Sequence, residues 1–143
     1  MPSKHSCEGR DISPPLAWSG VPGDAMSLAL VVDDPDAPDP KAPKRVFVHW
    51  VVHNLPVGHT DLNEGASETG MPEGAVQGVN DYRQDSYRGP CPPIGRHRYF
   101  HKLYALDVTL PPQPLTKGAL EAAIEGHVLA QAELIGTYQK GDR

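Results

Sequence analysis

Three aspartates stand close together at Asp33, Asp34 and Asp36, in a segment that Pro35 and Pro38 stiffen. Carboxylates at this spacing repel one another unless hydrogen-bond donors or a cation hold them. Aspartates in turns commonly accept hydrogen bonds from nearby main-chain N–H groups, and for this segment alone that structural interpretation is favoured. The alternative is a site in which the carboxylates support histidines or hold a ligand.

Two histidines and a tyrosine could complete such a site. His49 lies among apolar residues, and a lone histidine in that setting is more often a core residue bonded to a main-chain carbonyl. Residues 89–95, GPCPPIG, predict a stiff turn that leads to His97 and Tyr99. A plain hairpin connection would explain that turn equally well.

Three long strands are expected to position these residues. Residues 27–33, SLALVVD, are an almost unbroken apolar run and predict a buried strand that ends at the aspartates. Residues 35–44 contain four prolines, so we expect a rigid loop there and neither strand nor helix. Residues 45–55 predict a second strand that carries His49, and residues 98–110 predict a third. The faces of the second strand would be Val46, Val48, Trp50 and Val52 on one side and Phe47, His49, Val51 and His53 on the other.

The remaining segments are less regular. Residues 56–93 are rich in Gly, Asn, Asp, Ser and Pro and predict a long loop system with one short strand at residues 76–79. Thr116 resembles a helix N-cap, and the apolar spacing predicts a helix from Lys117 to about Gly126. A terminal strand toward Tyr138 follows, although the helix could instead continue past Gly126. Strands with one late helix predict a mainly β, α+β domain of the sandwich type.

Composition excludes several classes of protein. The 143 residues suit one domain, and 16 prolines with 14 glycines favour short strands and turns over a helical bundle. A net charge of −5 without a Lys/Arg cluster argues against a nucleic-acid partner. No apolar run approaches the roughly 20 residues that span a bilayer, and the polar N-terminus has no signal-peptide core. We therefore expect a cytoplasmic protein with no membrane span.

Cys7 and Cys91 are the only cysteines and stand far apart in the chain. Their spacing suits neither a zinc ribbon nor a thioredoxin-type motif. A disulfide is possible, but reduced thiols are the commoner state in a cytoplasmic protein. We expect two separate thiols.

Several motifs follow one another from Ser13 to Tyr138. They are SPPLAW at 13–18, DPDAP at 34–38, HWVV at 49–52, NDY at 80–82, GPCPP at 89–93, HRY at 97–99, YALD at 104–107 and GH at 126–127. In this order they resemble the phosphatidylethanolamine-binding protein family, which includes Raf kinase inhibitor protein, and most closely its bacterial and archaeal members. The combination of DPDAP with GPCPP and HRY is the most specific part of the resemblance.

The resemblance implies a β-sandwich with one C-terminal helix and, at one end, a small pocket for phosphate, acetate, cacodylate or a phospholipid head group. The ligand-binding residues carried over by position are Asp34, Asp36, Pro38, His49, Gly89, Pro90, Cys91, His97 and Tyr99. Trp18 and Tyr82 match positions near the pocket rim. We expect no catalytic residue, metal ion or cofactor.

Two aspartates beside an anion would repel it unless they act indirectly. A carboxylate that accepts a hydrogen bond from an imidazole fixes the tautomer of the ring, and the far N–H can then point at a ligand. We therefore expect Asp34 and Asp36 to orient His49 and His97. The Tyr99 hydroxyl and main-chain N–H groups near Cys91 would be further donors.

The expected function is non-catalytic binding or regulation directed at a phosphate-like anion or a phospholipid head group. One alternative is inhibition of a protease or kinase by protein contact, as in eukaryotic members of the family. Another is hydrolysis by a metal or acid–base site built from the Asp/His cluster. The chain offers no activated nucleophile for hydrolysis, because Cys91 is flanked by prolines and no G-x-S-x-G turn occurs.

The chain begins where family members already have an N-terminal strand. We therefore expect one domain over residues 1–143 that lacks this strand. An unpaired strand edge invites pairing with another chain, so we expect a homodimer.

Overall fold

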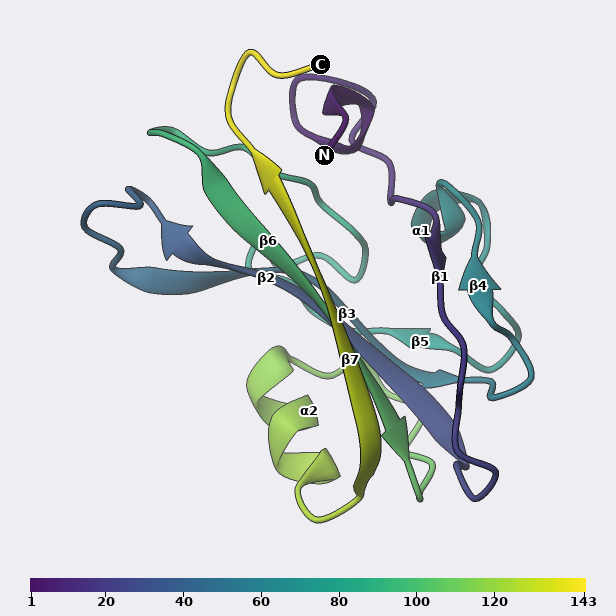
Figure 1. The fold of residues 1–143 in the computed structure, drawn as a ribbon. Coiled ribbons are helices and arrows are strands. Elements are labelled where there is room, and N and C mark those ends of the chain that lie inside the picture. Colours follow the sequence, from purple (N-terminus) through teal and green to yellow (C-terminus); the bar gives the residue numbers. More distant parts are fainter.

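The computed structural model describes residues 1–143 and is built on a five-stranded antiparallel sheet (Figure 1). Across this sheet the order is β5 (Val76–Gln77), β3 (Arg45–Leu55), β2 (Ser27–Ala37), β6 (His97–Leu106) and β7 (Val128–Tyr138). The central strand β2 pairs antiparallel with both of its long neighbours, β3 and β6. The expected mainly β fold is confirmed.

Ten of the eleven residues of β2 are buried. Successive side chains of a strand point to opposite sides of the sheet, so both faces of β2 are covered. Leu28, Leu30 and Val32 enter the first core. A second, two-stranded sheet packs over this face, formed by β1 (Leu16–Ala17) and β4 (Asp61–Leu62), together with the one-turn helix α1 (Ala66–Thr69). The second sheet is small, with two residues in each strand.

The opposite face of the sheet is covered by the helix α2 (Lys117–Ile124), as Figure 1 shows. Leu120 and Ile124 of this helix pack against Ala29 and Val31 of β2 in the second core. The helix begins as expected, because the Thr116 hydroxyl accepts a hydrogen bond from Ala119 N at 3.2 Å. The terminal strand is confirmed as β7, and the short strand near residue 76 as β5.

Residues 35–44 were expected to contain no strand, but β2 continues through Pro35 to Ala37. The register between β2 and β3 shifts between Asp34 and Ala37. Proline is tolerated at such an irregularity, because its missing N–H is not needed for the ladder. The expectation of a loop is therefore wrong for the first three of these residues.

The expected alternation along β3 fails at Val48. The register shifts between the pairs Val32–Trp50 and Asp33–Val48, which is a bulge at the level of His49. As a result Val48 packs in the second core, on the other side of the sheet from Trp50. The third long strand also ends earlier than expected, at Leu106.

Cys7 and Cys91 form a disulfide, so the expectation of two separate thiols is wrong. Their Cα atoms lie 5.4 Å apart, although 84 positions separate them in the chain. The 3₁₀ turn η1 (Ser3–His5) precedes a segment that folds onto the Pro-rich loop, where Cys7 N donates to Pro90 O at 3.0 Å. The N-terminal segment is thus covalently joined to the Pro-rich loop.

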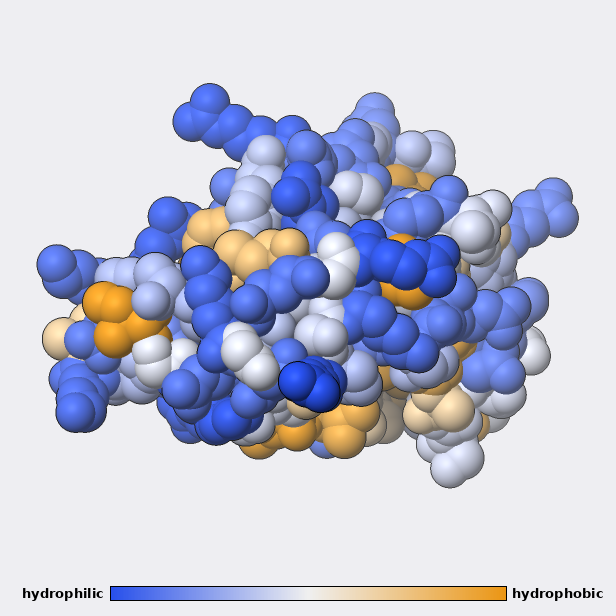
Figure 2. Space-filling model, turned by 90° about the horizontal axis from the view of Figure 1, so that it is seen from above, coloured by the Kyte–Doolittle hydropathy of each residue, from blue (hydrophilic) through white to orange (hydrophobic).

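The surface at the end of the molecule that holds both termini is mostly hydrophilic, with small apolar patches (Figure 2). None of the helices has the length and apolar composition needed to cross a membrane.

Candidate functional site

A cavity of about 400 Å³ opens at the end of the large sheet where β2 ends and β3 and β6 begin. Antiparallel neighbours run in opposite directions, so the C-terminal end of β2 meets the N-terminal ends of both partners. The loop that carries Cys91 and the loop that carries Tyr82 complete the wall. The topology of the sheet thus brings together residues from distant parts of the sequence.

Most of the expected ligand-binding residues line this cavity. They are Asp34, Pro38, His49, Cys91, His97 and Tyr99, with Tyr82 from the expected rim. Asp36, Gly89 and Pro90 do not line it. Trp18 packs against the first core and lines a separate cavity together with Leu16 and Leu103.

The cavity also has lining residues that the sequence reasoning missed, namely Ala37, Lys44, Arg45, Phe47, Pro92 and Pro93. The sequence pattern could have indicated two of them, Arg45 and Phe47. Arg45, Phe47 and His49 alternate along the start of β3, so a strand there puts all three on one face.

His97 and Asp34 form a buried pair with a distance of 2.6 Å between His97 Nδ1 and Asp34 Oδ2. The other ring nitrogen, Nε2, lies 2.9 Å from Ile94 O and 3.1 Å from Pro38 O. A carbonyl oxygen only accepts, so Nε2 must carry a proton. Both nitrogens of His97 are therefore engaged within the protein, and the expectation that its far N–H points at a ligand is wrong.

Asp36 does not orient a histidine, contrary to expectation. Its carboxylate accepts three hydrogen bonds from Arg98, from Nε at 3.0 Å, Nη2 at 2.9 Å and the main-chain N at 2.9 Å. The hydrogen bonds from the Arg98 side chain hold the pKa of Asp36 below its usual range. Asp36 N in turn donates to Asp34 Oδ1 at 2.7 Å. This bond agrees with the interpretation in which aspartates of the cluster accept main-chain hydrogen bonds.

His49 has one engaged and one free ring nitrogen. Nδ1 lies 2.7 Å from Arg88 O and must donate its proton to this carbonyl. The side chain is buried, and burial lowers its pKa against the opposing influence of the Arg88 hydrogen bond and of Asp34, Asp11 and Asp33. A neutral ring in this tautomer leaves Nε2 with a lone pair and no hydrogen-bond partner in the protein.

The aromatic wall of the cavity supplies a second free polar group. The Tyr99 ring lies edge-on to His49, with 5.3 Å between ring centroids, and its hydroxyl makes no hydrogen bond within the protein. Burial raises the pKa of Tyr99 far above its usual range, so the hydroxyl keeps its proton. Phe47 and Tyr82 also lie beside His49, at centroid distances of 5.0 and 6.2 Å.

Two cations stand at the rim of the cavity. Arg45 donates from Nη2 to Asp81 Oδ2 at 3.1 Å, and its guanidinium group lies 4.9 Å from the centre of the Phe47 ring. Lys44 makes no ion pair. Asp34 is paired to His97 and Arg45 to Asp81, so Lys44 is the lining cation that has no ion pair.

No group of three or more His, Cys, Asp or Glu side chains is arranged to hold a metal ion. The geometry instead combines a free imidazole nitrogen, a free hydroxyl and two rim cations in one small cavity. The sequence profile of the phosphatidylethanolamine-binding protein family matches residues 1–139. The chain belongs to this family.

Related chains of the family occur in archaea and bacteria. The chain is 52% identical to a UPF0098 protein of Methanothermobacter thermautotrophicus, over 99% of this chain and 91% of the relative. It is 48% identical to a UPF0098 protein of Chlamydia pneumoniae, over 98% of this chain and 91% of the relative. These relatives bear no name that states an activity.

Two solved structures of family members share the fold. One is a putative phosphatidylethanolamine-binding protein homologue of Chlamydia trachomatis, with a TM-score of 0.87 and 46% identity over 97% of this chain and 88% of that one. The other is YbcL of Escherichia coli, described as a member of the mammalian family, with a TM-score of 0.86 and 34% identity over 97% of this chain and 90% of that one.

Proposed function

We propose that the chain is a non-catalytic binding protein whose cavity takes a phosphate-like anion, including that of a phospholipid head group. The observation that carries this proposal is the pair of unpartnered polar groups, His49 Nε2 and the Tyr99 hydroxyl, on one cavity with Lys44 and Arg45 at its rim. A volume of about 400 Å³ suits a small ligand. The name of the family, which refers to a phospholipid, supports the same class of ligand.

The Tyr99 hydroxyl and the two cations are suited to anionic oxygens. Tyr99 would donate its proton to one phosphate oxygen, and a hydrogen bond to a charged group contributes about 1.5–3 kcal/mol. Lys44 and Arg45 would attract the anion and bind its outer oxygens. Their contribution falls with salt because both side chains are exposed.

His49 sets a condition on the ligand. The lone pair on Nε2 repels an oxygen that carries no proton, because both atoms are acceptors. A monohydrogen phosphate group avoids this conflict by donating its P–OH proton to Nε2. A phosphodiester has no such proton, so its binding requires the ring to take one up. Binding and protonation are therefore coupled at this histidine.

Titration calorimetry with inorganic phosphate tests the proposal. We expect saturable binding with a Kd between micromolar and millimolar, as for a free anion in a small site. The variant Tyr99→Phe removes the donor hydroxyl and keeps the ring, so it should bind about 10- to 100-fold more weakly. The control Tyr104→Phe changes a tyrosine of the same strand outside the cavity and should bind as the wild type does. Equal affinities of both variants, or no binding by the wild type, would contradict the proposal.

We also propose that a second copy of the chain pairs along β7. This strand is the outer edge of the large sheet, and eight of its residues in succession are exposed. Val128, Leu129, Leu134 and Ile135 are apolar side chains among them. Glu133 is the one charged residue of the strand, so the edge lacks the charges that usually prevent pairing.

A further inference from the structure

Residues 3–12 pack tightly on residues 87–91, the segment that leads to the cavity wall. The Tyr87 hydroxyl donates to His5 O at 2.7 Å, and both residues are buried. Gly89 lies so close to this segment that a Cβ atom there would overlap His5 O. The two segments therefore form one unit although they are far apart in the sequence.

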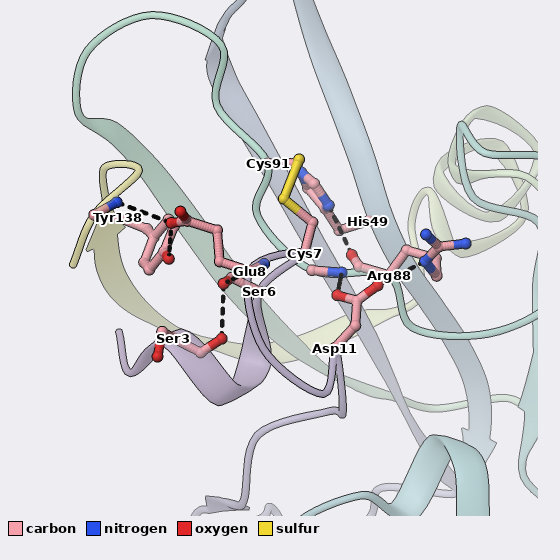
Figure 3. Close-up of a disulfide and its surroundings, with 11 residues drawn as sticks. Ser3, Ser6, Cys7, Glu8, Asp11, His49, Arg88, Cys91 and Tyr138 are labelled. Atoms are coloured by element: carbon pink, nitrogen blue, oxygen red, sulfur yellow. Dashed lines mark hydrogen bonds and ion pairs between the residues drawn. A yellow bond between two sulfur atoms is a disulfide. The ribbon is translucent and has the colours of Figure 1, made fainter. Parts of the chain in front are cut away.

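Asp11 is the polar centre of this contact (Figure 3). Its Oδ1 accepts from Gly89 N at 2.7 Å, and its Oδ2 accepts from Arg88 Nε at 2.7 Å. The residue adopts a φ of 59°, in the left-handed region that Asp adopts more readily than most residues other than glycine. One carboxylate thus fixes both the main chain and the side chain at the start of the loop.

The main chain of Arg88 is in turn bound to His49 in both directions. Arg88 N donates to His49 O at 3.2 Å, and His49 Nδ1 donates to Arg88 O at 2.7 Å. The second bond decides which ring nitrogen of His49 carries the proton. A shift of Arg88 O away from the ring would remove the reason for the Nδ1–H tautomer.

The disulfide holds the same unit from the other end of the loop. Cys91 lines the cavity together with Pro92 and Pro93, and its partner Cys7 belongs to the N-terminal segment. Figure 3 shows the disulfide, His49 and the contacts of Asp11 around this loop. Residues 88–91 are thus fastened at both ends to residues 7–11.

We propose that Asp11 is a positioning residue for His49 and that the Cys7–Cys91 disulfide makes this positioning sensitive to thiols. This inference rests on the anion-binding function proposed above. Asp11 and the disulfide hold residues 88–91 so that Arg88 O accepts from His49 Nδ1 and Nε2 stays available to the ligand. A dithiol reductant transfers two electrons and two protons to the disulfide, giving two protein thiols and the oxidised reductant. The reduced protein should hold His49 less firmly and bind phosphate more weakly.

The tautomer of His49 is the readout that distinguishes positioning from general stability. Nitrogen-15 spectra of the imidazole rings separate the Nδ1–H form from the Nε2–H form, and the resonances are assigned with His49→Gln. We expect the Nδ1–H form in the wild type and a mixture in Asp11→Ala, with phosphate binding about 5- to 10-fold weaker. Asp11→Asn keeps an acceptor for Gly89 N but turns its amide NH2 toward the Arg88 Nε–H, so it should restore the wild-type tautomer in part. Circular dichroism establishes that each variant is folded.

Glu8 provides a matched control. It belongs to the same segment but accepts from the Tyr138 hydroxyl and from Gly141 N, away from the Arg88 loop. Glu8→Gln should therefore leave both the His49 tautomer and the phosphate affinity unchanged. If Glu8→Gln and Asp11→Ala have the same effects, the role of Asp11 is general stabilisation and the inference is wrong.

The thiol part is tested on the folded protein with dithiothreitol. Reduction should weaken phosphate binding and broaden the tautomer population of His49, and reoxidation should reverse both. The double variant Cys7→Ser with Cys91→Ser should behave as the reduced protein and not respond to the reductant. A reduced, folded protein with the wild-type tautomer and affinity would overturn this part. If the wild type binds no phosphate, the proposed function fails, while the tautomer comparison still decides the role of Asp11.

Discussion

His97 and Asp34 share one proton inside the protein, across the 2.6 Å between Nδ1 and Oδ2. Their side chains are 1% and 4% exposed. Because Nε2 already donates to Ile94 O and Pro38 O, the pair as a whole carries no net charge. It joins the end of β2 to the start of β6 and forms the uncharged floor of the cavity.

This pairing predicts that His97→Ala is a stability variant. The change leaves the Asp34 carboxyl buried without its partner, which costs about 3–5 kcal/mol for a broken buried pair. Urea unfolding followed by circular dichroism measures the loss. A loss below about 1 kcal/mol would show that Asp34 finds solvent or another donor. It would contradict the description of His97 and Asp34 as a buried pair.

The stability of the protein should fall as the pH decreases from about 7 to 5. Burial lowers the pKa of both His49 and His101, so near pH 6 the unfolded chain binds more protons than the folded one. The contribution of these two groups to the free energy of unfolding is complete above about pH 6.5, the histidine pKa in the unfolded chain, and decreases as the pH falls below it. Each group contributes a slope of at most about 1.4 kcal/mol per pH unit.

The two histidines can be tested separately by their effect on this slope. In His49→Gln and in His101→Gln the free energy of unfolding should depend less steeply on pH than in the wild type, whatever the absolute loss of stability. The double variant should have the flattest profile, since the residues lie on different strands. Wild-type slopes in all three variants would contradict the assignment of both as buried neutral rings.

The rim cations should contribute to phosphate affinity in a salt-dependent way. Lys44→Ala and Arg45→Ala should each weaken binding about 2- to 5-fold at low ionic strength and less at 0.5 M salt. Lys41→Ala is the control, because Lys41 belongs to the same loop but does not line the cavity. Calorimetry at two salt concentrations measures all three, and an equal effect of Lys41→Ala would mean that only overall charge matters.

Pairing along β7 predicts a dimer in solution. Leu134 is 61% exposed on this edge, and a charge there should prevent close approach of a second strand. Analytical ultracentrifugation of the wild type should give a dimer at tens of micromolar, and Leu134→Glu should give a monomer. A monomeric wild type at that concentration would rule this interface out.

The long strands could be predicted because their pattern is local. Residues 45–55 are rich in β-branched and aromatic side chains, and the strand β3 has these bounds. The N-cap at Thr116 likewise depends on nearby residues alone. The bulge at His49 could not be predicted, because it arises from the pairing with β2 and reverses the side of Val48.

The chemistry of the cavity was harder to predict than its location. Asp34 and Asp36 look alike in the sequence, and only the fold assigns the first to His97 and the second to Arg98. The role of His97 depends on two carbonyls from separate loops, at Pro38 and Ile94. Contacts between separate loops leave no pattern in the sequence from which they could be predicted.

The disulfide was missed for a similar reason. Cys7 and Cys91 come together because a ten-residue N-terminal segment packs on the loop at Gly89, and this packing depends on contacts at both segments. Asp11, which makes the central contact, has no neighbouring residue that marks it as part of a site. The expected cytoplasmic location suggested separate thiols, whereas the fold brings the two cysteines together.

A phosphate titration followed by nuclear magnetic resonance tests the central claim most directly. The ring nitrogens of His49 and the ring of Tyr99 should shift in a saturable way, with His49 Nε2 gaining a hydrogen-bonded proton, while His101 outside the cavity stays unchanged. The affinity from these shifts should match that from calorimetry. Saturable shifts elsewhere, or none at His49 with phosphate in the tens of millimolar, would contradict the assignment of this cavity as the anion site.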